Sequence, residues 1–426
     1  MVVLIMFTGI FFTLLGKSIE KAIINPLTVF SLMFTLISFG AYLQLFGLYG
    51  ADEATYAIIF VGMLLFGIGY TISTNVVFKR KTSPIAKNSL ANGGYVIRYK
   101  LLYVFSIIAL VYLIGDAVIA ISYLLRGYSL KYIRFSLYGY SESDYYSQST
   151  ISYSLRYYVI QPITSLLPIM CIVDMFYGKK NKVLLISSIF IFGLSIITSG
   201  GRLPVLYLIT NIFALFSILD RRLQFSSKVK RRIILLYFIL LSLILFITFQ
   251  RDIIDVMSNY YKYFVGCVPH LQLYMDKLNA TDYMSYGAST FKSPVQLFLL
   301  ALRLLRIIPD YPEWFYRLAE FTDISKTVYI GSGYDMRYNG FVTVFYYFFL
   351  DFGYFSVAFF SLVFGFIARK VYFNAKYYTN VRNLAILCIL FQIIVVSFAR
   401  FELSIPRYFI TLILLFFCCK KVTEYE

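Results

Sequence analysis

Long apolar runs alternate with short polar connections along almost the whole chain. A membrane-spanning helix needs about 20 predominantly apolar residues, and eleven runs approach that size. They predict eleven spans, at residues 2–15, 27–48, 56–78, 101–124, 157–177, 183–198, 203–219, 233–249, 341–368, 384–399 and 403–419. The pattern therefore predicts an all-α, polytopic helix bundle in a membrane.

One long segment interrupts this alternation and divides the chain. Residues 1–250 form an N-terminal set of spans with one outer loop at 125–156, residues 251–340 form a large extracytoplasmic loop, and residues 341–426 form the C-terminal spans. Short helices are expected inside the large loop. Between Pro294 and Ile308, Arg303 and Arg306 would share one helical face and leucines another, which predicts an interfacial helix on the outer leaflet. A short re-entrant element is the alternative.

Composition supports the membrane class and narrows the chemistry. The 426 residues are 60% hydrophobic and 14% charged, well beyond the roughly 45–50% and 25% of soluble domains. One histidine and five cysteines without zinc spacing predict no metal site and no cofactor. Without a Walker or dinucleotide-binding motif, any substrate must reach the outer face already activated, and nothing indicates nucleic acid.

Lysine and arginine placement predicts the orientation. If the N-terminus lies outside, the inner segments hold 23 of the 39 basic residues but only 5 of the 21 acidic ones. The outer segments are then neutral overall. By the positive-inside rule, we expect the N-terminus and the long loop outside, the C-terminus in the cytoplasm, and the first run retained as a span. The basic excess also predicts contact with membrane lipids.

Three arginines stand at the outer ends of predicted spans and are candidates for substrate binding. They are Arg202 in a tight Ser-Gly-Gly-Arg turn, Arg251 and Arg400. A guanidinium can hold a diphosphate through two parallel hydrogen bonds. The alternative is that these side chains only reach from helix ends into the polar interface.

Two acids within predicted spans also require an explanation, because charge is costly there. Asp116 neighbours Gly115, which favours a helix-packing site. Asp351 interrupts the apolar run at 341–368, and we expect it either to cap a second half-helix or to bind a substrate hydroxyl.

The candidates for proton transfer are Asp335, Glu402 and His270. Asp335 is preferred because it belongs to a cluster of turn formers, rings and charges at residues 331–339. Arg400 beside Glu402 would stabilise its ionised form and make it a weaker base, and a lone histidine is more often structural. In the same cluster the predicted substrate-binding residues are Tyr334, Arg337, Tyr338 and Asn339.

Several short motifs resemble those of the oligosaccharide repeat unit polymerases, the O-antigen and capsule polymerases of the Wzy type. They are residues 197–206 (ITSGGRLPVL), 286–291 (YGASTF), 339–343 (NGFVT), 351–354 (DFGY) and Gly365, and the likeness extends over about residues 183–372. The arginine-x10-glycine repeat of some members is absent, so that site is not transferred to this chain.

This resemblance implies a metal-independent glycosyltransferase of the bacterial inner membrane, GT-C-like, acting in lipopolysaccharide or capsule biosynthesis. It would transfer a growing glycan from undecaprenyl diphosphate to another undecaprenyl-diphosphate-linked oligosaccharide, with a polysaccharide chain-length regulator as a partner. An O-antigen ligase, a flippase for lipid-linked oligosaccharides and a scaffold are the alternatives. A flippase would need a polar path through the bundle, and few charges lie within the predicted spans.

Overall fold

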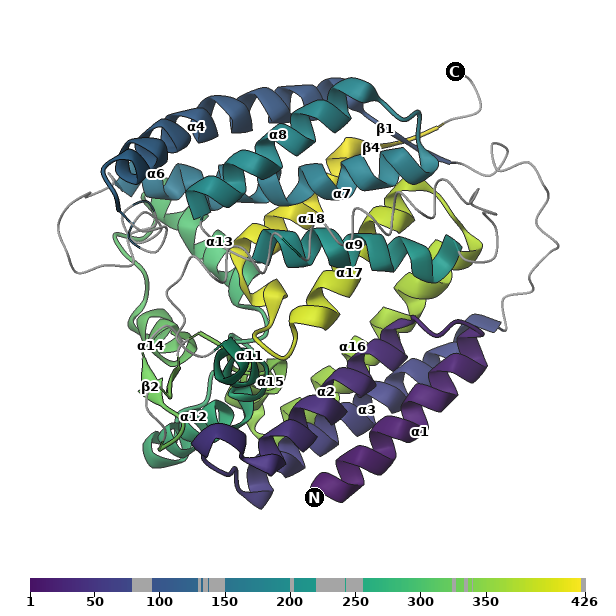
Figure 1. The fold of residues 1–426 in the computed structure, drawn as a ribbon, viewed down its shortest axis with the longest axis vertical. Helices are drawn as coiled ribbons and strands as arrows, with labels where there is room; N and C mark the ends of the chain where they lie inside the picture. Colours follow the sequence, from purple (N-terminus) through teal and green to yellow (C-terminus); the bar gives the residue numbers. More distant parts are fainter. Residues whose placement is uncertain are drawn as a thin grey trace. The chain divides into compact units, whose positions relative to one another are not determined.

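The computed structural model describes residues 1–78, 94–128, 132, 137, 150–199, 203–219, 242, 256–323, 327–332, 336–338 and 340–422. Helices make up 79% of it, as the sequence predicts. Figure 1 shows the helices, and the described residues also contain two small two-stranded sheets.

The helices that precede the long loop are α1 (Val2–Glu20), α2 (Pro26–Leu43), α3 (Glu53–Phe78), α4 (Tyr99–Leu125), α6 (Thr150–Leu155), α7 (Gln161–Tyr177), α8 (Lys182–Ser199) and α9 (Leu203–Leu219). The loop and the C-terminal part contain α11 (Val256–Val265), α12 (Cys267–Thr281), α13 (Lys292–Leu304), α14 (Glu313–Thr322), α15 (Val344–Phe352), α16 (Tyr354–Tyr377), α17 (Val381–Val396) and α18 (Pro406–Cys418). Short elements are η1 (Leu45–Gly47), the π-turn η2 (Arg156–Ile160), η3 (Glu402–Ser404), β1 (Tyr95–Ile97), β2 (Val328–Tyr329), β3 (Arg337–Tyr338) and β4 (Cys419–Lys421).

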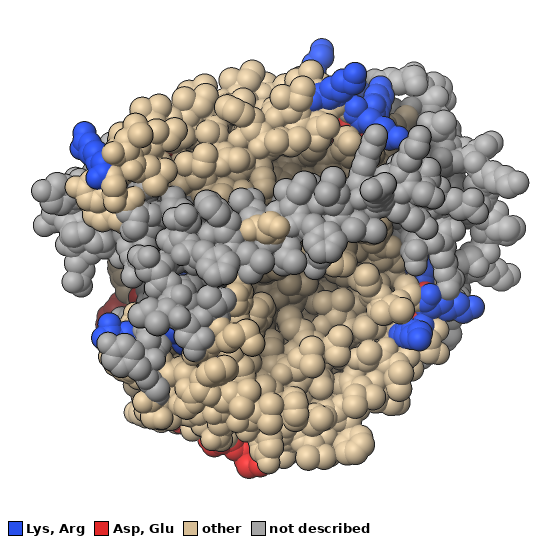
Figure 2. Space-filling view, viewed as in Figure 1, with Lys and Arg blue, Asp and Glu red and all other residues tan. Residues whose placement is uncertain are grey.

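Seven helices of the described part are long and apolar enough to cross a membrane. They correspond to the first six predicted spans and to α16, and shorter apolar helices occupy 203–218, 381–396 and 406–418. Apart from residue 242, the predicted span at 233–249 lies outside the described residues. In Figure 2 the surface over α4 and α8 is free of charge, with Lys and Arg at its margins. A multi-pass helical membrane protein is therefore confirmed, while eleven spans stay a prediction.

The predicted span at 341–368 is wrong in its bounds, because the helix breaks at Gly353. This glycine has φ 64° and ψ −141°, a conformation that side chains with a Cβ rarely adopt. Ser356 completes the break by accepting from the Phe352 amide at 2.9 Å and donating to the Phe348 carbonyl at 2.5 Å. The apolar run therefore becomes α15 followed by the candidate span α16.

The predicted interfacial helix is also shorter than expected. α13 ends at Leu304, and Arg306 follows it in the left-handed region with φ 60°. Leu297 and Leu300 are half-buried against the protein. Arg303 and Arg306 therefore do not share a helical face.

The described residues form two compact units, each assembled from separated segments. Unit 1 combines residues 1–83, 255–374 and 390–409, and unit 2 combines 84–254, 375–389 and 410–426. The predicted division into two sets of spans and a loop follows position along the chain, whereas each unit draws on both sets. All the candidate site residues described below belong to unit 1.

Small residues bring the helices of unit 1 into close contact. A Cβ atom added to Gly9 in α1 would come within 1.7 Å of Thr35 Oγ1 in α2, and one added to Gly365 in α16 would come within 2.0 Å of the Phe66 carbonyl in α3. Membrane helices pack through such contacts because lipid supplies no hydrophobic force between them.

Asn25 and Pro26 start α2, with the Asn25 side chain accepting from the Thr28 amide at 2.9 Å.

Unit 1 has different polar contacts at its two ends. At one end, the buried Glu20 of α1 accepts from the Tyr70 hydroxyl and pairs with the buried Arg369 of α16, both at 3.0 Å. At the other end, the amino group of Met1 lies 3.1 Å from Glu53. The buried charges of α1 and α16 are thus paired with each other, as in a membrane-spanning bundle.

The connection between α2 and α3 contacts the long loop at that second end. The Tyr49 amide donates to the Ile330 carbonyl at 2.8 Å, and the Asp52 amide donates to Gln272 at 2.9 Å. The sequence places both segments on the same side of the membrane, and their contact agrees with that.

Unit 2 joins several segments that the sequence places on one side of the membrane. Asp174 of α7 accepts from the Tyr99 hydroxyl at 2.5 Å and from the Asn181 amide at 2.7 Å. The segment that precedes α4 also pairs with the segment that follows α18. These segments are the antiparallel strands β1 and β4, with Tyr95 opposite Lys421. These contacts agree with the predicted alternation of sides.

Asp116 is half-buried and pairs with a buried arginine, contrary to the predicted helix-packing role for Gly115. Arg156 Nη2 lies 2.7 Å from the Asp116 carboxylate, and its guanidinium lies over the Tyr112 ring. A Cβ atom added to Gly115 would meet nothing within 4 Å. The acid in this span is tolerated because its charge is paired.

Candidate functional site

A buried carboxylate between two arginines forms the centre of the candidate site in unit 1. Glu402 is 0% exposed, and its Oε1 accepts from Arg400 Nε at 3.0 Å. Arg407 Nη2 lies 3.9 Å from Oε2. The two arginine side chains are 23% and 20% exposed. We call Arg400, Glu402 and Arg407 the arginine cluster, which has one net positive charge within reach of solvent.

Neighbouring segments fix the backbone that carries the arginine cluster. The Val342 amide donates to the Ala399 carbonyl at 2.9 Å, just before Arg400. On the other side, Ser293 at the start of α13 donates to the Leu403 carbonyl at 2.6 Å. Pro406 then begins α18, one residue before Arg407. The turn between α17 and α18 is therefore held from the long loop, as a preorganised binding site requires.

This geometry favours a positioning role for Glu402 over the predicted role as a base. Both of its oxygens face guanidinium groups, and no part of the residue is exposed. The carboxylate is therefore placed to hold the two arginine side chains in position. Arg400 keeps its predicted place among substrate-binding candidates, and the structure adds Arg407, which the sequence analysis missed. The sequence does contain a feature that points to Arg407: it follows Arg400 closely along the chain, across a Ser-Ile-Pro turn.

His270 is buried in α12 with an orientation that the structure defines. Its Nδ1 lies 2.6 Å from the Phe341 carbonyl, which can only accept, so Nδ1 carries the proton. Nε2 is buried without a hydrogen-bond partner among the described residues. Burial lowers the pKa of His270 below its ordinary value, and the bond with the Phe341 carbonyl opposes that shift. The ring is thus neutral, with Nε2 free to accept a proton but closed off from solvent.

Tyr338 belongs to the same buried cluster and does not offer an open face to a sugar. Its ring is 4% exposed and lies edge-on to His270 at a centroid distance of 5.1 Å. The predicted stacking role of Tyr338 therefore has no support in this conformation. Arg337, its neighbour in β3, is exposed and donates to the Tyr329 hydroxyl at 3.1 Å.

Asp351 has neither of its two predicted roles. Its Oδ1 accepts from the Ser285 hydroxyl at 2.5 Å and from the amides of Gly287 and Ser289 at 3.0 and 2.9 Å. Oδ2 accepts from the Thr290 amide at 3.1 Å. The carboxylate is 0% exposed. Asp351 therefore holds the loop before α13 in place, and its oxygens are occupied by that loop rather than by a substrate hydroxyl.

Five predicted site residues lie outside the described residues. They are Arg202, Arg251, Tyr334, Asp335 and Asn339. Their predicted roles stay predictions, including that of Asp335 as the preferred base.

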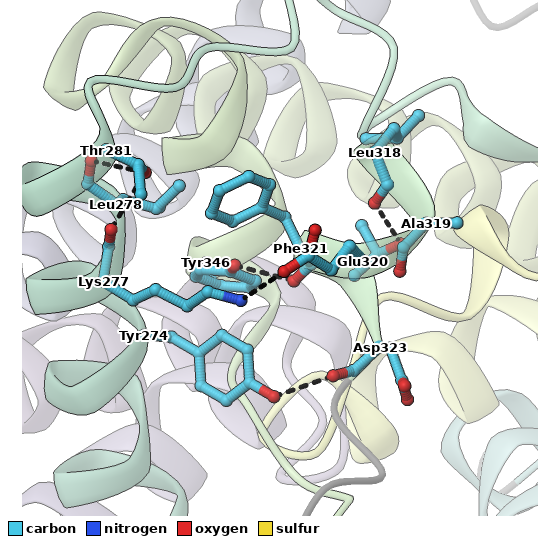
Figure 3. A network of polar contacts seen from close by, with 11 residues as sticks. Tyr274, Lys277, Leu278, Thr281, Leu318, Ala319, Glu320, Phe321, Asp323 and Tyr346 are labelled. Carbon is cyan, nitrogen blue, oxygen red and sulfur yellow. Dashed lines mark hydrogen bonds and ion pairs between the residues drawn. The ribbon is translucent and has the colours of Figure 1, made fainter. Parts of the chain in front are cut away.

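Figure 3 shows how α12 and α15 hold the end of α14 by hydrogen bonds to its last carbonyl groups. The Tyr274 hydroxyl donates to the Asp323 carbonyl and the Tyr346 hydroxyl donates to the Phe321 carbonyl, both at 2.8 Å. Lys277 Nζ lies 3.3 Å from Glu320 Oε1, and both side chains are exposed. Carbonyls at a helix end lack partners within the helix, and these tyrosines supply partners for two of them.

Lys292, at the start of α13, is a half-buried amine that the sequence analysis did not single out. Its Nζ donates to the Thr322 hydroxyl at the end of α14. Burial lowers the pKa of Lys292 to about 8, with Asp323 opposing the shift. Next to it, Ser293 contacts the turn that carries Glu402. Only tertiary packing creates this environment, because the surrounding sequence is that of an ordinary loop.

Aromatic rings join the parts of the site. Tyr274 lies edge-on to His270, with ring centroids 4.9 Å apart, and 5.1 Å from Tyr346. Tyr347, next in α15, is close enough to Arg400 and Glu402 for electrostatic interaction. The arginine cluster and His270 are therefore placed by the same group of helices, α12, α15 and the α17–α18 turn.

These features define a helical membrane protein with a structured polar loop and a positively charged cluster beside it. Within the described ranges no group of three or more His, Cys, Asp or Glu side chains is arranged to hold a metal ion. No model of a known protein family, no curated protein and no solved structure matches the chain.

Proposed function

We propose that this protein polymerises lipid-linked oligosaccharide repeat units at the outer face of a bacterial inner membrane. The observation that carries the proposal is the arginine cluster, in which Glu402 holds Arg400 and Arg407 with net positive charge and partial exposure. A diphosphate leaving group on a membrane lipid needs such fixed cations where the spans end. The long loop beside the cluster supplies a polar surface for glycan.

In the proposed reaction a hydroxyl oxygen of the acceptor sugar attacks the anomeric carbon of the donor glycan. A new glycosidic bond forms while the bond from that carbon to the diphosphate oxygen breaks. The electron pair leaves with undecaprenyl diphosphate, whose developing charge Arg400 and Arg407 stabilise. The hydroxyl proton passes to a general base. Asp335 remains the proposed base, because His270 is closed off from solvent and Glu402 faces two arginines.

The N-terminus and the long loop are proposed to lie outside and the C-terminus in the cytoplasm, on the evidence of the basic residues in the inner segments. Undecaprenyl-diphosphate-linked oligosaccharide is the proposed substrate, and a chain-length regulator the proposed partner. Deleting the gene and separating the surface polysaccharide on a gel tests the class. Single repeat units are expected. Intact lipid-linked polymer that fails to reach the surface would indicate a ligase, and lipid-linked units trapped inside would indicate a flippase.

The arginine cluster is tested with lysine substitutions in purified protein supplied with lipid-linked repeat units. Arg400→Lys and Arg407→Lys are each expected to lower the transfer rate about 10²- to 10³-fold, the cost of removing a preorganised donor to a developing anion. Lysine is expected to fail because a point charge does not reproduce two parallel hydrogen bonds.

Arg317→Lys, on the exposed face of α14, is the matched control and should keep the wild-type rate. Wild-type rates in both cluster variants, at normal protein levels, would contradict the proposed role of the arginines.

A further inference from the structure

The chain turns sharply after α13 and presents its apolar side chains outward. The Leu305 amide donates to the Ala301 carbonyl at 3.0 Å and the Ile307 amide to the Leu302 carbonyl at 2.9 Å, so the turn is hydrogen-bonded. Arg306 takes the left-handed conformation, φ 60°, that ends many helices. We call residues 304–307 the α13 tip.

An ion pair and hydrogen bonds connect the side chains at the base of the α13 tip. Arg303 Nη1 lies 3.7 Å from Asp310 Oδ1 across the turn. Asp310 also accepts from the Tyr311 amide at 2.8 Å. A hydrogen bond from the Tyr316 hydroxyl lowers the pKa of Asp310 and keeps it ionised. These contacts connect the two sides of the turn at the base of the α13 tip.

The exposed surface of the α13 tip is aliphatic. Leu304, Leu305 and Ile307 are 75%, 70% and 64% exposed, and Phe298 on the preceding turn is 62% exposed. Neighbouring exposed apolar residues on an ordered turn mark a contact surface. Water would be an unfavourable environment for such a group.

The residues around the tip show which environment it fits. Arg306 is exposed at the tip itself, with no acidic partner among the residues that the structure describes. Trp314 and Tyr316 at the start of α14 are 47% and 50% exposed. Aliphatic side chains, an arginine and amphipathic rings occur together where proteins enter the lipid–water interface.

We propose that the α13 tip inserts into the lipid–water interface of the membrane that this chain spans. Leu304, Leu305 and Ile307 would enter the upper acyl region, and Arg306 would contact phospholipid phosphate groups. The candidate spans of the same chain keep the long loop beside this surface, so little entropy is lost on insertion. Phospholipid fits better than a glycan because the tip has few polar groups. The proposal needs only the membrane and does not rest on the proposed function.

Trp314 is the only tryptophan of the chain and reports on this region without labelling. The full-length protein is reconstituted in vesicles whose phospholipids carry bromine, a contact quencher, near the top of their acyl chains. Trp314 is expected to lose at least about half of its emission, because interfacial groups reach about 5–10 Å into the headgroup and acyl boundary. Bromine near the chain ends should quench less, and iodide in the water should quench little.

A variant with Leu304, Leu305 and Ile307 all changed to Ser should lose most of the bromine quenching and become accessible to iodide. The matched control is Leu273→Ser, which removes a leucine that is 41% exposed on α12 and should behave as the wild type. Arg306→Glu, which leaves the apolar side chains in place, is expected to weaken quenching in vesicles rich in anionic lipid. This single variant also tests the proposal if the triple variant fails to fold.

Three results would overturn the proposal. Strong iodide quenching without bromine quenching in the wild type would place the tip in water. Protection from both quenchers would mean that protein covers the tip. Undiminished bromine quenching in the folded Ser variant would show that lipid contact at Trp314 does not involve the tip.

Discussion

Glu402 is a buried carboxylate that contacts two arginine side chains. Its carboxylate brings two guanidinium groups together that would otherwise repel each other, and it leaves the group with a net positive charge. Removing one member of a buried ion pair leaves the partner uncompensated and typically costs about 3–5 kcal/mol. The loss of Glu402 would therefore disturb the fold as well as the arginines, which is why the lysine variants of the arginines are the better test.

His270 makes the stability of the protein depend on pH. Burial lowers its pKa in the folded state below the ordinary value of 6.5, so the unfolded chain takes up the proton at higher pH. The stabilisation is complete above about pH 6.5 and is lost as pH falls through the folded-state pKa.

Acidifying from pH 7.5 to 5.0 should therefore lower the unfolding temperature of the wild type more than that of His270→Gln. The limiting slope is about 1.4 kcal/mol per pH unit, which corresponds to a few °C per unit. Thermal unfolding in detergent at both pH values measures it. Equal shifts in the two proteins would show that other groups dominate the acid response.

At the residue scale, the sequence predicted which chemical groups belong to the candidate site better than how deeply each side chain is buried. Arg400 and Glu402 were identified because charged residues are rare near spans, and the structure brings them together with Arg407. Tyr338 and Asp351 were assigned to substrate because they carry suitable groups. Their burial depends on which loops pack over them, and the local sequence does not determine that.

Among the elements, the loop before α13 owes its shape to a residue much later in the chain. Three backbone amides and one hydroxyl of residues 285–290 point at the Asp351 carboxylate. Hydrogen bonds to a charged group contribute about 1.5–3 kcal/mol each. This carboxylate therefore acts as a clamp between α15 and the entry to α13.

Asp351→Asn should destabilise the protein by about 2–5 kcal/mol, because an amide has one acceptor fewer and presents N–H groups to backbone donors. Chemical unfolding and proteolysis within 285–291 would both register the loss. Asp276→Asn, at an exposed position of α12, is the matched control and should change little. A variant as stable and as resistant as the control would mean that the loop keeps its shape without the clamp.

Hydropathy predicted the spans because it follows the free energy of moving each segment into lipid. It did not find the break at Gly353, which within this apolar run only the acid at Asp351 indicated. It also overextended α2, which ends at Leu43 rather than at residue 48. Such boundaries depend on backbone dihedral angles and on contacts between elements, to which average polarity is insensitive.

At the scale of the whole molecule the main expectation is the sidedness of the membrane. Asn279→Cys in α12 should react with an impermeant thiol reagent in intact spheroplasts, whereas Lys179→Cys should react only after lysis. Both positions are exposed, and all five native cysteines are buried, so background labelling should be low. Labelling of Lys179→Cys but not Asn279→Cys in intact cells would reverse the proposed orientation.

The pairing of β1 with β4 has a consequence for how the protein is made. Tyr95–Ile97 leaves the ribosome early, yet its partner, Cys419–Lys421, arrives after all the candidate spans. Unit 1 likewise is complete only when residues 390–409 pack with helices that begin at residue 2. Helices inserted early must therefore remain in the bilayer with their polar partners missing until synthesis reaches the last segments. Quality-control proteases would meet this incomplete intermediate, so ribosome stalling late in the message would be more harmful than its position suggests.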